Sequence, residues 1–387
     1  MFNKKNFFSG YSSNSKKTLK AFKLLKNDIE NSNIPVLDSY KKDYPMDFST
    51  LLVRKFSTYK NIVIIGMGGS ILGAQSIYSF LKKKIKKKIF FFDNLDENLY
   101  SNFLNNQNIE NSCFVIISKS GNTIETIVNS NLILSKIKSK NKIVFITEIN
   151  DNALINLAYK LNAEIIEHKN YIGGRYSVLS EAGMFPAELM GLKTEKFKNL
   201  KNLIKNKNFS SCLIKNVNTI YSLLTRNISN LVILNYDSNS NNLCEWYKQM
   251  ISESLGKNKL GVTPIISNCP KDHHSILQLY LDGPKNKFFT FFSSKSDNKK
   301  INSVLNAQCE AVKRVLRKKK IPYREFFFKK RNEEELGNIF TFFVIETLLL
   351  AKLMKVNPFD QPAVEQIKIE TKKILGQNLP KTILDTP

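Results

Sequence analysis

Hydroxyl side chains cluster after an apolar run in the first third of the chain. The segment 118–126 reads Ser-Lys-Ser-Gly-Asn-Thr-Ile-Glu-Thr, and Cys-Phe-Val-Ile-Ile precedes it at 113–117. The apolar run predicts a buried strand, and the spacing of Ile124, Ile127 and Leu132 predicts a helix after it. N–H groups at the start of a helix attract anions, and hydroxyls add hydrogen-bond donors. An ordinary N-cap needs one hydroxyl and this segment offers four, so we interpret it as a site for a phosphate monoester.

A second junction of strand and helix occurs earlier in the chain. Asn-Ile-Val-Ile-Ile at 61–65 predicts a buried strand, and Gly-Met-Gly-Gly-Ser-Ile-Leu-Gly follows at 66–73. The glycines allow the backbone to approach a ligand closely. A dinucleotide site begins similarly, and Asp93 lies at a plausible distance for its acidic residue. The G-x-G-x-x-G spacing fails, however, because Ile71 stands where the third glycine should be, so a small phosphorylated ligand is favoured.

Strands and helices alternate around these two junctions. Strands are expected at 61–65, 88–93, 113–118, 142–147 and 163–167, with helices between them. Such alternation predicts an α/β fold with a mainly parallel sheet flanked by helices. Ligands bind at the carboxyl ends of the strands in such sheets, which is where both junctions lie.

Alternation resumes after a helical stretch at 194–226, with strands expected at 231–236 and 287–293. A length of 387 residues suits about two domains. We expect an N-terminal helical segment at 1–45, a first domain with the phosphate loops at 46–200, a second domain at 201–355, and a C-terminal helical segment at 356–387 that packs back on the active site. The boundary near 200 is the least defined of these.

Composition narrows the class of protein. The formal charge of +26, with basic runs at 82–88 and 317–320, would by itself favour a nucleic-acid partner. No recognition motif accompanies these runs, so we interpret them as solvated faces that attract anionic substrates and expect no specific nucleic acid. The five scattered cysteines form no C-x-x-C pair, which predicts neither a disulfide framework nor a zinc site and suits a reduced cytoplasm.

Membrane and export signals are weak in the sequence. The first residues contain no apolar stretch of signal-peptide length. The longest apolar stretch, at 339–354, is interrupted by Glu346 and is too short for a membrane span, so it predicts a buried helix. We therefore expect a cytoplasmic protein with no membrane partner.

The two junctions resemble the phosphosugar loops of the glucose-6-phosphate isomerase family, and four further segments match that family in order. These are Gly173-Gly174-Arg175-Tyr176-Ser177, Glu253-Ser254-Leu255-Gly256-Lys257, His274 with Gln278 and Gly283, and Asn357-Pro358-Phe359-Asp360-Gln361-Pro362 running on to Val364, Glu365 and Lys368. One loop would indicate only the sugar-isomerase fold, whereas six ordered segments over 61–368 are highly specific. The resemblance implies two sugar-isomerase-type domains and an aldose–ketose isomerase of glycolysis and gluconeogenesis.

The implied reaction interconverts glucose 6-phosphate and fructose 6-phosphate by ring opening and a cis-enediol intermediate. It requires no metal ion and no organic cofactor, so we expect neither. The implied substrate-binding residues are Gly69, Ser70, Ser118, Lys119, Ser120, Thr123, Thr126 and Gln361. The family is typically a homodimer whose active-site histidine comes from the neighbouring subunit, so a shared active site is expected.

Glu253 is the candidate base that moves a proton between C2 and C1. Apolar residues at 243, 246, 247, 250 and 251 form a helical stripe, and Glu253 falls at its edge near the end predicted by Gly256. A carboxylate near a helix C-terminus is electrostatically disfavoured, which strengthens it as a base. Glu245 points away from the stripe and is expected to face solvent. Leu255 replaces the family's usual asparagine.

Three other residues complete the implied chemistry. Arg175 follows two glycines and is the candidate donor to the enediolate oxygen. His274 is the candidate acid–base for ring opening, chosen by its register to Gln278, although the adjacent His273 stays an alternative. Lys368 is the second ring-opening candidate, with Ala363 and Ile367 replacing glycines that are usual in the family.

Two further functions stay open on the sequence alone. One is an isomerase for another phosphosugar, such as mannose 6-phosphate, and the other is a non-catalytic regulator that binds sugar phosphates with the same fold. The Glu-Ser-Leu-Gly-Lys and Asp-Gln-Pro segments favour glucose 6-phosphate. Retention of Glu253, Arg175, His274 and Lys368 together speaks against the regulator.

Overall fold

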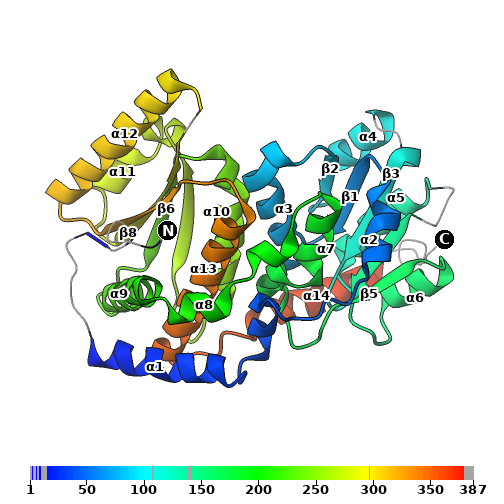
Figure 1. Ribbon diagram of the computed structural model, residues 1–387, viewed down its shortest axis with the longest axis horizontal. Coiled ribbons are helices and arrows are strands. Elements are labelled where there is room, and N and C mark those ends of the chain that lie inside the picture. Colours follow the sequence, from blue (N-terminus) through cyan, green and yellow to red (C-terminus); the bar gives the residue numbers. More distant parts are fainter. Residues whose placement is uncertain are drawn as a thin grey trace. The chain divides into compact units, whose positions relative to one another are not determined.

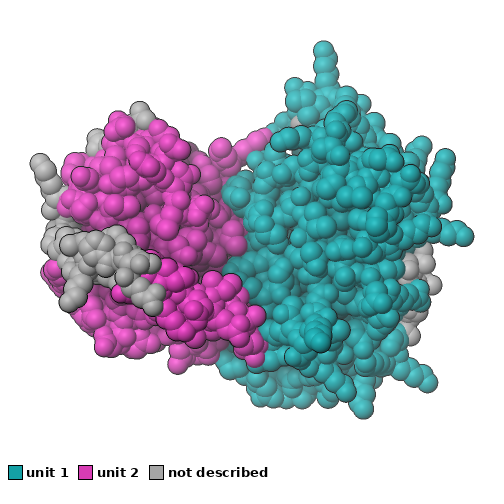
Figure 2. Space-filling model, turned by 180° about the vertical axis from the view of Figure 1, so that it is seen from behind, with its two compact units in different colours: residues 1–42, 79–81, 195–359 teal, residues 43–78, 82–194, 360–387 magenta. Residues whose placement is uncertain are grey.

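The computed structural model describes residues 2, 6, 8, 9, 15–106, 109–137, 142–295 and 297–378. The chain forms two compact units, which Figure 2 colours separately. Unit 1 comprises residues 1–42, 79–81 and 195–359, and unit 2 comprises residues 43–78, 82–194 and 360–387. Each unit contains one parallel sheet (Figure 1). The four predicted segments and their boundaries stay a prediction.

Unit 2 is built on a five-stranded sheet in the order β2-β1-β3-β4-β5. The strands are β1 (Asn61–Gly66), β2 (Lys88–Phe92), β3 (Ser112–Ile117), β4 (Ile143–Thr147) and β5 (Glu164–Glu167). All neighbours are parallel, and the three central strands are buried along their whole length. Continuous apolar runs are typical of strands covered on both faces. The predicted α/β architecture is therefore confirmed here.

Helices of unit 2 cover this sheet. One face packs against α4 (Glu97–Asn106), α5 (Ile124–Leu134) and α6 (Ala153–Lys160) through an apolar cluster that includes Phe103, Ile133 and Leu157. The other helices that lie wholly or mainly in the unit are α2 (Thr50–Ser57), α3 (Gly69–Leu81), α7 (Glu181–Leu189) and α14 (Pro362–Asn378). Short 3₁₀ turns occur at Lys82–Lys84, Ile109–Asn111 and Gly174–Leu179. The strand-to-helix connections after β1 and β3 carry the predicted phosphate loops.

Unit 1 contains a four-stranded parallel sheet in the order β7-β6-β8-β9. Its strands are β6 (Asn230–Asn235), β7 (Thr263–Asn268), β8 (Lys287–Ser294) and β9 (Tyr323–Phe328). The sequence predicted β6 and β8 but neither edge strand. Pro264 argued against a strand at β7, because proline is tolerated only in edge strands or at strand ends. In β9, the charged residues Arg324 and Glu325 interrupted the apolar pattern.

Helices also cover both faces of the sheet of unit 1 (Figure 1). Along one face, α11 (Leu277–Asp282) and α12 (Lys299–Lys318) contribute to an apolar cluster with β6 and β8. The remaining helices are α1 (Lys16–Glu30), α8 (Leu200–Lys205), α9 (Lys207–Leu224), α10 (Asn241–Leu255) and α13 (Glu333–Met354). Short 3₁₀ turns lie at Pro35–Tyr40, Thr194–Phe197, Ser238–Ser240 and Lys271–His274.

Helix α13 is the buried helix that the apolar stretch predicted. It is long and apolar enough to cross a membrane by length and composition, but 89% of its most apolar window is buried inside the protein. Its Phe343 stacks on Tyr247 of α10 with ring centroids 4.0 Å apart. The helix thus serves as a core element of unit 1.

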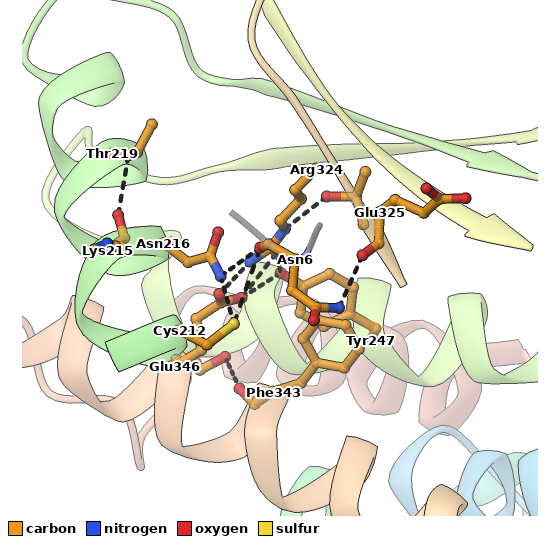
Figure 3. Close-up of polar contacts among 12 residues, drawn as sticks. Asn6, Cys212, Lys215, Asn216, Thr219, Tyr247, Arg324, Glu325, Phe343 and Glu346 are labelled. Atoms are coloured by element: carbon orange, nitrogen blue, oxygen red, sulfur yellow. Dashed lines mark hydrogen bonds and ion pairs between the residues drawn. The ribbon is translucent and has the colours of Figure 1, made fainter. Parts of the chain in front are cut away.

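An ion pair lies at the centre of this core (Figure 3). The side chains of Arg324 on β9 and Glu346 on α13 are fully buried and in direct contact. The guanidinium also donates to Glu346 Oε2 at 3.0 Å, to the Tyr247 hydroxyl at 3.1 Å and to Thr290 Oγ1 at 3.0 Å. Tyr247 in turn donates to Glu346 Oε2 at 2.9 Å. Every charge is therefore matched by hydrogen bonds, which a buried ion pair requires.

Candidate functional site

The glycine loop after β1 touches the loop that carries Arg175. A Cβ atom placed on Gly69 would lie 2.2 Å from the carbonyl carbon of Gly174 and 2.4 Å from the amide nitrogen of Arg175. Only glycine permits so close an approach of two backbones. The Ser177 hydroxyl donates to the Gly174 carbonyl at 2.7 Å and lies 3.4 Å from the Gly69 carbonyl, 108 positions away in the sequence. Two distant segments of the chain are thereby brought together.

The hydroxyl loop after β3 makes a tight turn before α5. Gly121 has φ +65°, and a Cβ there would lie 1.8 Å from Asn152 Oδ1, so both conformation and space require glycine. Thr123 is the N-cap of α5, yet its side chain makes no capping hydrogen bond. Its Oγ1 instead accepts from Ser118 Oγ at 3.1 Å. Two of the predicted hydroxyls, those of Ser118 and Thr123, are thus in contact, and the Thr123 hydroxyl does not cap the first N–H groups of α5, which are the groups that attract anions.

Both loops leave the same edge of the sheet. Strands β1 and β3 are parallel neighbours, and Gly66 pairs with Ile117 at their carboxyl ends. Ser70 at the start of α3 is half-buried, while Thr126 in the first turn of α5 is buried and its hydroxyl has no hydrogen-bond partner in the described part of the chain. The geometry agrees with the predicted edge for ligand binding.

The side chains of Lys119 and Ser120 are not directed at the contact between Ser118 and Thr123. The Lys119 ammonium donates to the Asn170 carbonyl at 2.7 Å and lies 3.6 Å from a Glu148 carboxylate oxygen. It is therefore directed along the sheet edge rather than at the hydroxyl cluster. Ser120 is exposed, and its hydroxyl accepts weakly from the Asn122 amide at 3.4 Å.

Arg175 is held by the start of the C-terminal segment. Its side chain is 4% exposed, with Nη1 donating to Gln361 Oε1 at 3.0 Å and Nη2 to the Asp360 carbonyl at 3.1 Å. The guanidinium carbon lies 5.2 Å from the centre of the Tyr176 ring. Both Arg175 and Gln361 were predicted as site residues, and the structure places them in direct contact within unit 2.

Glu253 lies in the last turn of α10 in unit 1, where the sequence predicted it. The apolar stripe of this helix is buried, and the helix ends at Gly256, whose amide bonds the Ser252 carbonyl at 2.9 Å. Glu253 is half-buried, and its Oε1 accepts from Gln249 Nε2 at 2.8 Å. Glu245 lies off the stripe and pairs with Lys248 on the same helix. In the same motif, the Lys257 ammonium donates to the Asn357 carbonyl.

The two adjacent histidines differ in their surroundings. His273 is half-buried in unit 1, and its Nε2 lies 2.6 Å from the Tyr236 hydroxyl. Burial lowers the pKa of His273. His274 is exposed at the end of a 3₁₀ turn. The ring of His273 is thus occupied inside its own unit, whereas that of His274 faces outward.

Lys368 lies on α14 in unit 2 and is exposed. Its ammonium is 2.7 Å from a Glu365 carboxylate oxygen one turn earlier. In the described part of the chain, the Lys368 ammonium lies beside Glu365 and makes no contact with Arg175 or with the hydroxyl loop. Ala363 and Ile367 are exposed on the same helix.

His168 is a buried polar residue that the sequence did not single out. It follows β5 at the carboxyl edge of the sheet, and burial lowers its pKa to about 4. Its Nδ1 lies 3.3 Å from the Lys169 carbonyl, and its Nε2 has no partner among the residues that the structure describes. The ring is therefore neutral at neutral pH. Its place directly after a predicted strand was the available signal.

Comparisons with known proteins identify the family of the chain. A family model described as phosphoglucose isomerase matches residues 51–268. Glucose-6-phosphate isomerase of Methanocaldococcus jannaschii is 33% identical over 342 residues, covering 81% of this chain and 84% of that protein. Glucose-6-phosphate isomerase of Campylobacter jejuni is 30% identical over 373 residues, covering 86% of this chain and 89% of that protein.

Solved structures share the fold. A hypothetical protein from Thermus thermophilus aligns with a TM-score of 0.80 at 21% identity, covering 93% of this chain and 94% of that one. A glucose-6-phosphate isomerase from Chlamydia trachomatis aligns with a TM-score of 0.70 at 18% identity, covering 97% of this chain and 82% of that one. These structures support the fold, and the sequence matches support the family. The chain therefore belongs to the phosphoglucose isomerase family.

Proposed function

We propose that this chain interconverts glucose 6-phosphate and fructose 6-phosphate, with the loops of unit 2 holding the phosphate and Glu253 moving the proton. The activity follows from membership of the family. The observation that carries the assignment of residues is the joined glycine and arginine loops beside the hydroxyl loop. The phosphate would be bound by Ser118, Ser120, Thr123 and Thr126 together with the amides of Gly69 and Ser70.

The proposed chemistry balances without an external oxidant. The Glu253 carboxylate removes the proton from C2 of the open-chain aldose, and the electron pair moves to the carbonyl oxygen to give a cis-enediolate. Arg175 donates to the oxygen that becomes negative. A proton passes between the two oxygens, and the same carboxyl group returns its proton to C1. Carbon C1 is thereby reduced as C2 is oxidised.

Ring opening is assigned to His274 and Lys368. Exposure of His274 suits a residue that reaches the substrate of a neighbouring subunit, whereas His273 is engaged by Tyr236. Lys368 rests on its register in the motif alone, because its ammonium now pairs with Glu365. We further propose a cytoplasmic homodimer with shared active sites. Gln361 would act on the phosphate side through its bond to Arg175.

The purified protein is expected to convert glucose 6-phosphate to fructose 6-phosphate reversibly, with no added nucleotide and no loss of activity in EDTA. Coupled assays in both directions measure this, with mannose 6-phosphate as the competing substrate. Turnover confined to mannose 6-phosphate, or inactivation by EDTA, would contradict the proposal. Binding of sugar phosphates without turnover would instead identify the non-catalytic regulator.

Removing the Ser118 and Thr123 hydroxyls together, as Ser118→Ala with Thr123→Ala, should raise KM by about 10²- to 10⁴-fold, because two hydrogen bonds to the phosphate would be lost. Hydrogen bonds to a charged group contribute about 1.5–3 kcal/mol, and about 1.4 kcal/mol is a factor of ten. The value of kcat should change little, because phosphate is held alike in the ground and transition states.

Ser135→Ala is the matched control for this change. Ser135 caps the other end of α5, where its hydroxyl donates to the Leu132 carbonyl at 2.9 Å. Steady-state kinetics of both variants against wild type measure the effect. An unchanged KM in the double variant would remove the hydroxyl loop from the phosphate site.

A further inference from the structure

Both ends of the loop that carries Arg175 are tied to one short upstream segment. The loop runs from the end of β5 at Glu167 to the start of α7 at Glu181. The segment 44–47 precedes α2 and lies in the same unit. No motif of the sequence includes either Glu181 or residues 44–47, so their contacts are a separate observation.

Glu181 makes the first tie. Its side chain is fully buried, and the Tyr44 hydroxyl lies 3.0 and 3.1 Å from its two oxygens. The Asp47 amide donates to Oε1 at 3.2 Å. Burial raises the pKa of this carboxyl, and these donors oppose the rise. One carboxylate therefore fixes the start of α7 against two positions of the upstream segment.

Asp47 makes the second tie, at the other end of the loop. Its carboxylate accepts from the Glu167 amide at 2.6 Å and lies 3.9 Å from the Lys169 ammonium. Lys169 also pairs with the Glu167 carboxylate. The upstream segment thus holds both the beginning and the end of the arginine loop.

The backbone of the loop is closely packed between these two sets of contacts. A Cβ on Gly183 would lie 2.0 Å from the Val178 carbonyl oxygen, and one on Gly73 would lie 2.9 Å from the Val178 side chain. The Ser180 hydroxyl donates to the Ser177 carbonyl at 2.9 Å. Because the backbone is packed this tightly, a shift at Glu181 reaches Arg175 through a few rigid residues.

We infer that Tyr44, Asp47 and Glu181 form a loop clasp whose function is to position Arg175 for the enediolate, an inference that rests on the proposed role of this arginine. Tyr44 and Glu181 are positioning residues, since they act through the loop that carries Arg175. A buried carboxylate is a poor source of stability, because its desolvation offsets most of what its partners contribute. It does define a narrow geometry, and misplacement of a catalytic group by about 1 Å can lower a rate about 100-fold.

Tyr44→Phe and Glu181→Gln test the clasp with minimal change of volume. Each should lower kcat by about 10- to 100-fold while KM stays within about twofold, since neither change alters the hydroxyl loop after β3 that would bind the phosphate. Lys142→Met is the matched control. It removes a buried ammonium at the amino edge of the same sheet, where it bonds the Ile109 carbonyl at 3.0 Å and Glu110 at 3.1 Å. It should lower Tm without lowering kcat.

A double-mutant cycle with Arg175→Ala separates positioning from general stability. If the clasp acts through Arg175, adding Tyr44→Phe to Arg175→Ala should lower kcat by less than about twofold further. Additive losses, or a wild-type kcat in Tyr44→Phe, would overturn the clasp. A wild-type kcat in Arg175→Ala alone would overturn the proposed role of the arginine instead. Should Glu181→Gln fail to fold, Tyr44→Phe decides, because it keeps the ring and removes only the hydroxyl.

Discussion

Glu253→Gln is expected to abolish isomerisation and leave a folded protein that still binds substrate. Glutamine has nearly the size of glutamate but cannot accept the C2 proton, and a positioned base contributes about 10²–10⁴-fold to a rate. The change is mild for the fold, because Glu253 is half-buried and its partner Gln249 can bond an amide oxygen as it bonds the carboxylate. The loss should therefore appear in kcat rather than in stability.

Proton exchange at C2 in deuterated water measures the step directly, alongside turnover. Glu245→Gln is the control on the same helix, where the native carboxylate pairs with Lys248 at the surface. It should exchange and turn over at close to the wild-type rate. Exchange at a near wild-type rate in Glu253→Gln would show that another group is the base.

Arg324→Met is expected to destabilise unit 1 by about 3–5 kcal/mol, because it leaves the Glu346 carboxylate buried without its cation. The side chains of both residues are fully buried, so water cannot replace the lost bonds. The single tryptophan, Trp246, is buried in α10 of the same unit. Urea unfolding followed by its fluorescence therefore reports this unit.

Two further variants make this prediction specific. Arg324→Met combined with Glu346→Leu should be more stable than Arg324→Met alone, since removing both charges leaves no unpaired ion. Arg314→Ala breaks a pair on α12 in which Arg314 is 72% exposed, and it should change stability by less than about 1 kcal/mol. A double variant that is no more stable than the single one would contradict the account of the buried pair.

The sequence predicted those parts of the fold whose signal is local. Apolar runs bounded by turn residues identified all five strands of unit 2. The same rule missed β7 and β9, which lie at the edges of their sheet. Pro264 argued against a strand in β7, and the charged residues Arg324 and Glu325 interrupted the apolar pattern of β9. Glu346, the partner of Arg324, lies on a helix that the sequence could only describe as apolar with one interruption.

For the candidate site, too, local sequence patterns indicated residues but not the contacts between distant parts of the chain. The resemblance to the family selected Arg175 and Gln361 as candidates, but their contact joins positions 186 residues apart, and no local pattern encodes it. For Lys119, the sequence indicated a ligand contact, but the side chain makes a different contact in the structure. Its place beside hydroxyls predicted a charge on the phosphate, yet a flexible side chain can point either way, and its ammonium bonds the Asn170 carbonyl.

The contact between Arg175 and the segment at 360–361 has a consequence for the order of synthesis. A ribosome adds about 5–20 residues each second, so the partners of Arg175 are made about 10–40 s after the arginine itself. Until then, the growing chain contains the phosphate loops and the arginine loop but neither Gln361 nor the Asp360 carbonyl. The arginine can reach its final position only after residues 360–361 are made, which links the completion of this site to the synthesis of the segment that leads into α14.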